Sequence, residues 1–248
     1  MKLITCQGGR LLTLGEMLGD VNGVSQHVIT AAPDVPSFTT GLPALDALAP
    51  GGLFRRGAVH EVLSDPDEGA PLFFAMVLAR AAQGAGALVW CDPAHELYPP
   101  ALAAQGIDLD RLFLLQPKTP AEQTWAVGEC LKCKGVAAVV AAMKPAQRLS
   151  RLEARRLQLA AERGGGVGLL LRPAGKVSAE HAAATRWLVR PAPGERTVQR
   201  WEVQLVHGHG GRVGEVVILE HSRETNRLRA VEKLAGGRRR TPVDAETA

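Results

Sequence analysis

The sequence has few cysteines and no long apolar run, and each shortage excludes a class of protein. Its 248 residues include only four cysteines, too few for the disulfide framework of a small secreted domain. The chain shows neither a signal peptide nor a run of about 18 apolar residues, so we expect a soluble, cytoplasmic protein. Apolar residues make up 46% of the chain, which is enough to bury a core and excludes global disorder.

Charge is distributed unevenly along the chain. Residues 1–147 hold 10 Lys and Arg against 14 Asp and Glu, a net charge of −4. Residues 148–248 hold 19 against 11, a net charge of +8. The basic C-terminal part indicates that the partner is a polyanion or an acidic protein.

The most informative absence is that of a phosphate-binding lysine. An apolar run of strand length, Ala58–Leu63, precedes a glycine-containing loop and an Ala-rich helical run, Leu72–Gln83. This strand–loop–helix order is the scaffold of phosphate-binding loops, which need a Lys for the outer phosphates and a Ser or Thr for magnesium. Here Ala70 and Pro71 occupy those two positions.

The same loop is acidic, and its residues are Ser64, Asp65, Asp67, Glu68, Gly69, Ala70 and Pro71. A carboxylate about 5 Å from a phosphate, at an effective dielectric constant near 20, opposes binding by roughly 3 kcal/mol. A helix N-terminus favours an anion by at most about 2 kcal/mol. We therefore interpret the segment as a degenerate phosphate loop and predict that it binds no nucleotide or other cofactor.

The remaining pattern alternates between strands and helices, which predicts an α/β fold with a parallel sheet. Further strands are expected at Ala87–Cys91, Leu112–Leu115, Val136–Ala142 and Gly168–Leu171, and further helices at Pro93–Gln105, Pro120–Leu131 and Arg148–Arg163. Three later strands follow without helices between them, at Trp187–Arg190, Trp201–Val206 and Val216–Glu220, and the His207–Gly211 segment supplies a hairpin turn. We divide the chain into an N-terminal appendage and linker (1–37), a core (38–221) and a basic C-terminal helix and tail (222–248).

Two long segments carry a family resemblance. TTGLPALDALAPGGLFRRGAVHEVL (39–63) and CDPAHELYPPALAAQGIDLDRLFLLQP (91–117) resemble the RecA recombinase core in order and spacing. The resemblance covers roughly residues 38–220, and within that superfamily the chain looks most like the ImuA family of bacterial mutagenesis cassettes. It implies a RecA-like core, with a mostly parallel twisted sheet flanked by helices and a closing antiparallel hairpin.

Three parts of the RecA ATPase are missing in this resemblance. Ala70 and Pro71 replace the loop Lys and hydroxyl residue, Ala94 stands where the catalytic Glu is expected, and Val139–Ala142 lacks the magnesium-supporting Asp at its end. Phosphoryl transfer depends on all three parts. The resemblance therefore implies a pseudo-ATPase that is not an enzyme.

The function implied by the resemblance is that of an adaptor. It would act in the SOS response to DNA damage, in translesion synthesis, beside an ImuB-type inactive Y-family polymerase and an error-prone replicative-type polymerase, in the nucleoid region of the cytoplasm. RecA itself is a further candidate partner, because a RecA-shaped subunit could join a filament and fail to propagate it. Two alternatives stay open: a DNA-dependent ATPase or recombinase paralogue, and a SulA-like cell-division inhibitor.

Two groups of basic residues are candidates for binding a partner or non-specific DNA. The first is Arg148, Arg151, Arg155 and Arg156, in a predicted helix whose Leu149, Leu152 and Leu157 are expected to face the sheet. The second is Arg223, Arg227, Arg229, Lys233, Arg238, Arg239 and Arg240, around the predicted C-terminal helix. The alternative for the first group is an ordinary solvated helix face. Arginine runs carry no base specificity, so we expect the second group to dock a protein, the ImuB-type partner in the resemblance.

Three other features receive a structural interpretation or an open one. Cys130 and Cys133 form a C-x-x-C, but a zinc site needs two more ligands, so we predict no metal site. His207 and His209 flank glycines, and we assign them to the hairpin turn. The apolar residues between Leu11 and Leu18 are either an assembly surface or part of a frayed terminus.

Overall fold

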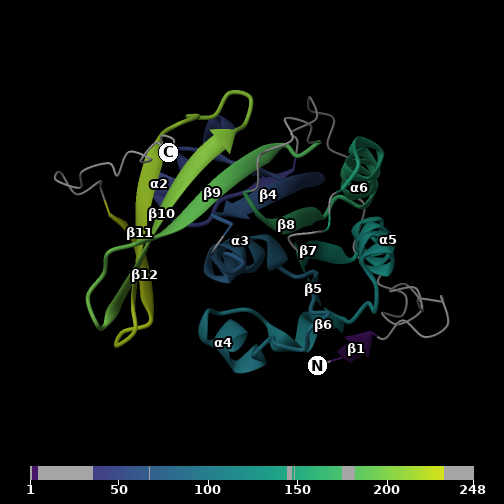
Figure 1. Cartoon of the computed structure of the whole chain (residues 1–248), viewed down its shortest axis with the longest axis horizontal. Helices are drawn as coiled ribbons and strands as arrows, with labels where there is room; N and C mark the ends of the chain where they lie inside the picture. Colours follow the sequence, from purple (N-terminus) through teal and green to yellow (C-terminus); the bar gives the residue numbers. More distant parts are fainter. Residues whose placement is uncertain are drawn as a thin grey trace, which may run out of the picture.

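A computed structural model of the chain describes residues 2–4, 36–66, 68–143, 147, 149–174 and 182–231. It is an α/β fold in which helices cover a mostly parallel, twisted sheet that continues into antiparallel strands (Figure 1). This architecture is RecA-like, as predicted. None of the helices within the described ranges is long and apolar enough to cross a membrane.

The elements follow one another in nearly regular alternation. The strands are β1 Lys2–Ile4, β2 Ser37–Phe38, β3 Phe54–Arg55, β4 Ala58–Ser64, β5 Ala87–Cys91, β6 Leu112–Leu115, β7 Val136–Ala142, β8 Val167–Pro173, β9 Thr185–Ala192, β10 Val198–His207, β11 Val216–Ser222 and β12 Arg227–Val231. The α-helices are α2 Pro43–Asp46, α3 Leu72–Gln83, α4 Pro99–Ala104, α5 Pro120–Leu131 and α6 Arg151–Gly164, and two 3₁₀ turns lie at Pro50–Gly52 and Leu109–Arg111.

Ten of the described strands form one sheet in the order β1-β6-β5-β7-β8-β4-β9-β10-β11-β12. Pairing is parallel from β1 to β9 and antiparallel from β9 to β12. The sequence analysis did not indicate β1, which pairs with β6 in parallel and forms one edge of the sheet. An edge strand of only three residues offers few unpaired backbone groups to another chain.

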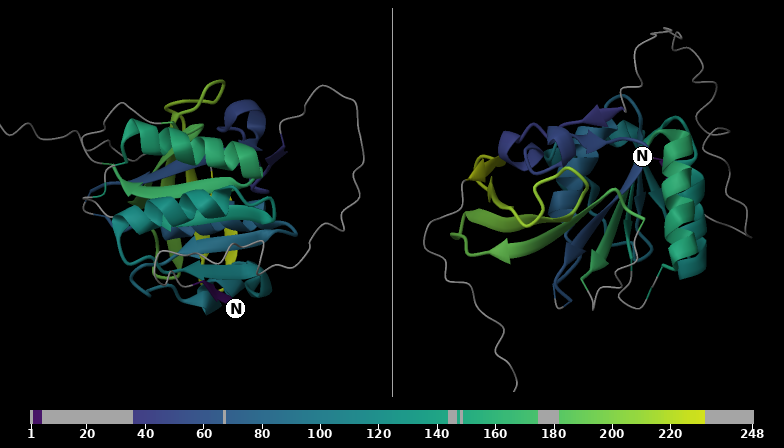
Figure 2. Two further views of the ribbon diagram at one scale, coloured as in Figure 1. Left: turned by 90° about the vertical axis from the view of Figure 1, so that its right-hand side faces the viewer. Right: turned by 90° about the horizontal axis from the view of Figure 1, so that it is seen from above.

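The sheet separates two layers of apolar side chains. Helices α5 and α6 lie side by side on one face (Figure 2, left) and pack on residues such as Val139 and Leu170. Helices α3 and α4 lie on the other face, where the larger cluster includes Leu88 and Leu169. The central strand β7, VAAVVAA, is apolar throughout because a parallel strand is covered on both faces.

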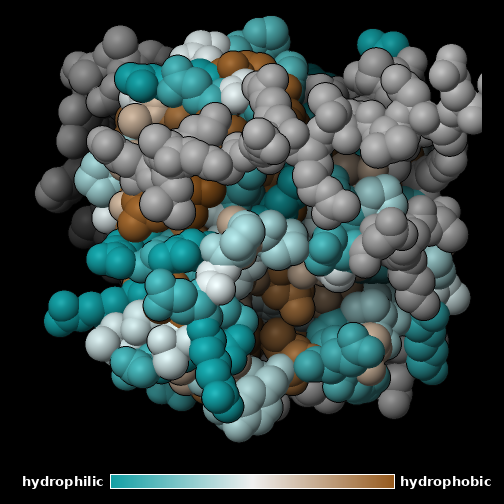
Figure 3. Space-filling view, turned by 60° about the vertical axis from the view of Figure 1, so that its left-hand side comes forward, coloured by the Kyte–Doolittle hydropathy of each residue, from teal (hydrophilic) through white to brown (hydrophobic). Residues whose placement is uncertain are grey.

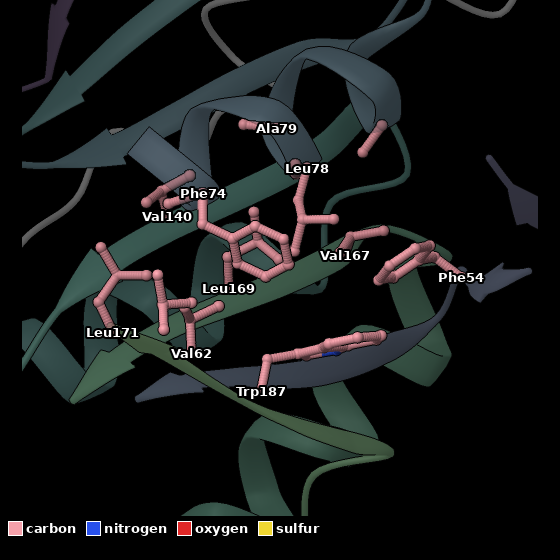
Figure 4. Packing of buried hydrophobic residues seen from close by; sticks show 14 of the residues in the cluster. Phe54, Val62, Phe74, Leu78, Ala79, Val140, Val167, Leu169, Leu171 and Trp187 are labelled. Carbon is pink, nitrogen blue, oxygen red and sulfur yellow. The ribbon is translucent and has the colours of Figure 1, made fainter. Parts of the chain in front are cut away.

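The larger cluster is centred on α3 and aromatic side chains. Figure 4 shows Phe74 and Leu78 pointing from α3 toward the sheet, where Trp187 of β9 lies. Trp187 stacks on Phe54 with ring centroids 5.2 Å apart, and its indole N–H donates to Thr185 Oγ1 at 2.8 Å. Burying such rings contributes most to a core of this kind, so α3 is held firmly behind the loop that precedes it.

The structure confirms most predicted elements and corrects three. Helices Leu72–Gln83 and Pro120–Leu131 have the predicted bounds. The predicted helix at 93–105 is reduced to Pro99–Ala104, because a residue before proline disfavours helical backbone. The helix predicted from Arg148 begins at Arg151, where Ser150 and Glu153 form a capping box. The predicted C-terminal helix is wrong within the described residues: Arg227–Val231 is a strand paired with β11.

Candidate functional site

The degenerate phosphate loop lies between the end of β4 and the start of α3. Ser64, the last residue of β4, is buried. The next residue, Asp65, accepts a hydrogen bond from Arg190 Nε of β9 at 2.8 Å, and both side chains are about half exposed. The acidic loop is thus partly neutralised by an arginine of this chain that the sequence analysis did not assign to it. Asp67 lies outside the described residues.

The backbone of this loop does not require a glycine at position 69, as a tight phosphate-binding loop would. A Cβ added to Gly69 would meet no atom within 4 Å, and the residue does not have a left-handed backbone. Helix α3 begins after Pro71 without a side-chain cap. A glycine is needed where a ligand or another backbone approaches closely or where φ is positive; at Gly69 the structure shows neither need.

Behind the loop, a carboxylate is buried between two arginines. Glu61 of β4 is 2% exposed, and its two oxygens accept from Arg172 Nη1 of β8 and Arg186 Nε of β9, each at 2.9 Å. The next residue back, His60, is fully buried and bonds to Thr185 Oγ1 at 2.7 Å. Burial lowers the pKa of His60 to about 4. These groups tie β4 to its two neighbours, β8 and β9.

Structural hydrogen bonds occupy the other two positions where an ATPase would carry its acidic groups. Ala94 is exposed, and the neighbouring Asp92 accepts from the backbone N–H groups of Glu96 and Leu97, both at 3.0 Å. At the end of β7, the Ala142 carbonyl accepts from Gln123 Nε2 at 2.9 Å. The strand end that supports magnesium in the resemblance is therefore closed by an amide of α5.

The first basic group lies on α6. Arg151, Arg155 and Arg156 are exposed, and Arg155 pairs with Glu162 at 3.8 Å. Leu149 packs at the margin of the smaller cluster and Leu157 is buried within it, as predicted. Leu152 is 61% exposed, so the expectation that it faces the sheet is wrong. Its position is five residues before Leu157, and on a helix of 3.6 residues per turn that spacing places it toward the solvent.

The second basic group lies at the opposite side of the molecule, around β11 and β12 (Figures 1 and 2). Arg229 is engaged by Glu220, whose carboxylate also accepts from Arg200 Nε at 2.8 Å. These two hydrogen bonds lower the pKa of Glu220. Arg223 and Arg227 are exposed. Figure 3 shows that hydrophilic residues dominate this side, with hydrophobic ones in patches between them and in a hollow.

The structure does not bring the two groups into one surface, because α6 covers β4 and β8 whereas β12 lies at the edge of the sheet. The other candidate residues lie outside the described residues: Arg148, Lys233, Arg238, Arg239 and Arg240. The same holds for the apolar segment between Leu11 and Leu18.

The cysteine motif is held in a helix end. Burial raises the pKa of Cys130 to about 12 and that of Cys91 to about 12, so neither thiol is ionised near neutral pH. Cys133 Sγ donates to the Glu129 carbonyl at 3.4 Å. Within the described ranges, no three His, Cys, Asp or Glu side chains are placed to hold a metal ion. His207 ends β10, and the connection to β11 includes the predicted glycine turn.

Comparison with known proteins identifies the family. No protein-family model matches the chain. Protein ImuA of Caulobacter vibrioides is 33% identical over 201 residues, which cover 72% of this chain and 81% of that protein, and a second strain gives the same values. The chain belongs to the ImuA family.

RecA proteins match this ImuA-family chain over a shorter span. RecA of Symbiobacterium thermophilum is 32% identical over 133 residues, 53% of this chain and 34% of RecA. RecA of Clostridium acetobutylicum is 33% identical over 108 residues, 43% of this chain and 30% of RecA. This likeness agrees with the RecA-like α/β fold of the chain.

Proposed function

We propose that this ImuA-family chain is a non-catalytic adaptor of the ImuA/ImuB mutagenesis cassette, active in DNA-damage-induced translesion synthesis. In this proposal it binds an ImuB-type protein and, through that complex, an error-prone replicative-type polymerase. The observation that carries the non-catalytic part is the loop after β4: Ala70 and Pro71 stand at the positions of the Lys and the hydroxyl residue, and Asp65 is held by Arg190. The two other acidic positions of an ATPase are filled by Ala94 and Ala142.

The simultaneous replacement of all three positions supports the absence of ATPase activity in this proposal. Phosphoryl transfer needs the phosphate cradle, the metal support and the group that positions the nucleophile at the same time. Replacing one of them can be compensated by a neighbouring side chain. At the described ends of β4, β5 and β7, however, three nearby polar side chains are already used in an ion pair or in backbone hydrogen bonds: Arg190, Asp92 and Gln123.

Nucleotide binding is tested by titration calorimetry of the purified full-length chain with Mg-ATP. The expected result is no binding heat, with a RecA protein measured under the same buffer as positive control. A micromolar dissociation constant, or hydrolysis stimulated by single-stranded DNA, would overturn the non-catalytic part and favour the recombinase paralogue.

The adaptor part is tested with a purified ImuB-type protein from the same organism. Saturable binding by the full chain is expected, and no binding would refute the adaptor proposal. The chain shortened to residues 1–231 tests the part of the second basic group that follows β12, namely Lys233 and Arg238 to Arg240, because this truncation leaves β12 in the chain. If the C-terminal residues dock the partner, the shortened chain loses most of the affinity.

Restraint of RecA is a further activity of the proposed adaptor. Its support is the RecA-like fold without an ATPase, which would allow a subunit to associate with a filament and not to propagate it. The expected result is a slower RecA strand-exchange reaction in the presence of the full chain. An unchanged rate at equimolar protein would exclude this part of the proposal.

A further inference from the structure

Helices α5 and α6 enclose an open groove on the outer face of the molecule. The two helices lie side by side over the smaller apolar cluster (Figure 2, left). The groove has a volume of about 550 Å³, and its apolar lining includes Trp125 and Gly128 from α5 and Leu159 and Ala160 from α6. Gly128 keeps the floor low, because it has no side chain in the middle of a helix where alanine would be favoured by about 1 kcal/mol.

Two large apolar side chains that line this groove are exposed to solvent. Trp125 is 44% exposed and Leu159 is 46% exposed, on two different helices that face the same groove. Leu152, one helical turn before Arg156, is 61% exposed on the same helix. Contiguous exposed apolar residues with a polar rim mark interaction surfaces, and tryptophan is enriched among the residues that dominate binding.

The rim of the groove is basic on the α6 side. Arg156 and Arg163 both line the groove, and among the described residues neither has an ion-pair partner. They are seven residues apart, so they lie on the same side of α6, about 10 Å from each other along the helix axis. This side of the groove therefore offers two guanidinium groups, neither within ion-pair distance of a carboxylate among the described residues, at a spacing of two helical turns.

The acidic residues in the groove are already engaged within the chain. Glu129 pairs with Lys132 at 2.5 Å on α5. Glu153 is held by Ser150 in the capping box of α6, and this hydrogen bond lowers the pKa of Glu153. The α5 side is thus close to neutral. With Lys132, Arg156 and Arg163 against Glu129 and Glu153, the lining carries three positive and two negative charges, a net charge of +1.

We propose that the groove between α5 and α6 binds an acidic amphipathic helix of the adaptor's protein partner. Apolar residues of that helix pack on Trp125 and Leu159, and two carboxylates seven residues apart pair with Arg156 and Arg163. The inference rests on the proposed adaptor function and names the chemistry that the partner presents to Arg156, a member of the first basic group, and to Arg163. A second copy of this chain fits less well, because two such rims facing each other would repel.

The groove is tested with two synthetic, fluorescently labelled helical peptides and the full-length chain. Both peptides carry leucines at positions i, i+4 and i+7; one carries Glu at two flanking positions seven residues apart, and the other carries Lys there. Fluorescence anisotropy at about 0.1 M ionic strength is expected to show binding of the Glu peptide about ten-fold tighter than that of the Lys peptide. Equal affinities, or no binding of either peptide, would overturn the proposal.

Two variants locate the binding surface. Arg156→Glu with Arg163→Glu is expected to weaken the Glu peptide and to favour the Lys peptide, and Trp125→Ala is expected to weaken both about ten-fold or more. The matched control is Arg80→Glu with Arg196→Glu, which changes the net charge equally at exposed positions outside the groove. Thermal unfolding of each variant verifies folding. If the control weakens binding as much as the groove variants, the attraction is only that of total charge and the proposal is wrong.

The same variants, measured against the ImuB-type protein, separate the two proposals. Weaker binding of the groove variants and native-like binding of the control support both. Equal binding of all variants refutes the groove and leaves the adaptor function intact. If the native chain does not bind the ImuB-type protein, the adaptor proposal fails and the peptide titrations still decide the groove. Loss of affinity for single-stranded DNA in the Arg156 and Arg163 variant, without any peptide binding, would assign the surface to nucleic acid and refute the proposal.

Discussion

Replacing Glu61 by alanine should destabilise this protein more than the loss of an exposed ion pair would. Glu61 is 2% exposed, and its partners Arg186 and Arg172 have side chains that are 11% and 23% exposed. In the parallel register Glu61 lies opposite Arg186. Glu61→Ala removes the only carboxylate within ion-pair distance of the two guanidinium groups in the described part of the chain, so both charges stay close together between strands without compensation.

The expected cost is about 3 kcal/mol. Removing one partner of a buried ion pair costs about 3–5 kcal/mol, and the lower end applies because Arg172 can still reach water. For a domain of this size, 1 kcal/mol corresponds to a change in Tm of about 2–4 °C, so Tm should fall by about 6–12 °C. Arg172→Ala should cost less than Glu61→Ala, because Glu61 then keeps Arg186.

Urea denaturation followed by circular dichroism measures the free energy of unfolding, and calorimetry measures Tm. The matched control is Asp65→Ala, which breaks the half-exposed pair with Arg190 and should cost no more than about 1 kcal/mol. If Glu61→Ala costs less than about 1 kcal/mol, or no more than Asp65→Ala, the burial of this carboxylate is not what makes the network important and the reasoning fails.

Three further predictions use other parts of the fold. Gly164→Ala should lower the free energy of unfolding in urea by about 3 kcal/mol, because the added Cβ would lie 2.0 Å from the Leu131 carbonyl oxygen. The control Gly69→Ala, whose Cβ would meet no atom within 4 Å, should lower it by less than about 0.5 kcal/mol. Equal losses of stability in the two variants would contradict this prediction. Burial lowers the pKa of His60 to about 4, so as the pH falls the unfolded state binds a proton before the folded state does. The contribution of His60 to the free energy of unfolding is therefore full above about pH 6.5, and about 2 kcal/mol of it is lost between about pH 7 and pH 5. The urea midpoint should change less between pH 7 and pH 5 in His60→Gln than in the native protein. An equal change in both proteins would refute this role of His60. Ser150→Ala removes the N-cap of α6 and should lower the free energy of unfolding by about 1 kcal/mol; no change in the urea midpoint would mean that the cap is dispensable.

The sequence by itself determined the central elements and the composition of the loop. Helices Leu72–Gln83 and Pro120–Leu131 and strand Val136–Ala142 have the bounds that periodicity and apolar runs predict. Local sequence features set where these elements begin and end. The helices have a proline at or just before the first turn, and the strand is an unbroken apolar run because a parallel strand is buried on both faces. The replacement of the phosphate-loop residues by Ala70 and Pro71 was equally visible, since it depends on residue identity alone.

Tertiary structure alone decided the partners of the charged residues. Arg190 reaches Asp65 and Arg186 reaches Glu61 across 125 positions of the chain, and no local pattern encodes such pairs. A charged residue in the apolar run of β4 was a signal that Glu61 needed a partner, but the sheet order that supplies it could not be read from the sequence. For the same reason the sequence suggested a helix where β12 pairs with β11: arginines and leucines favour a helix locally, whereas a free sheet edge and the carboxylate of Glu220 stabilise a strand. The groove between α5 and α6 likewise exists only because these two helices, which precede and follow β7 in the chain, pack on the same face of the sheet.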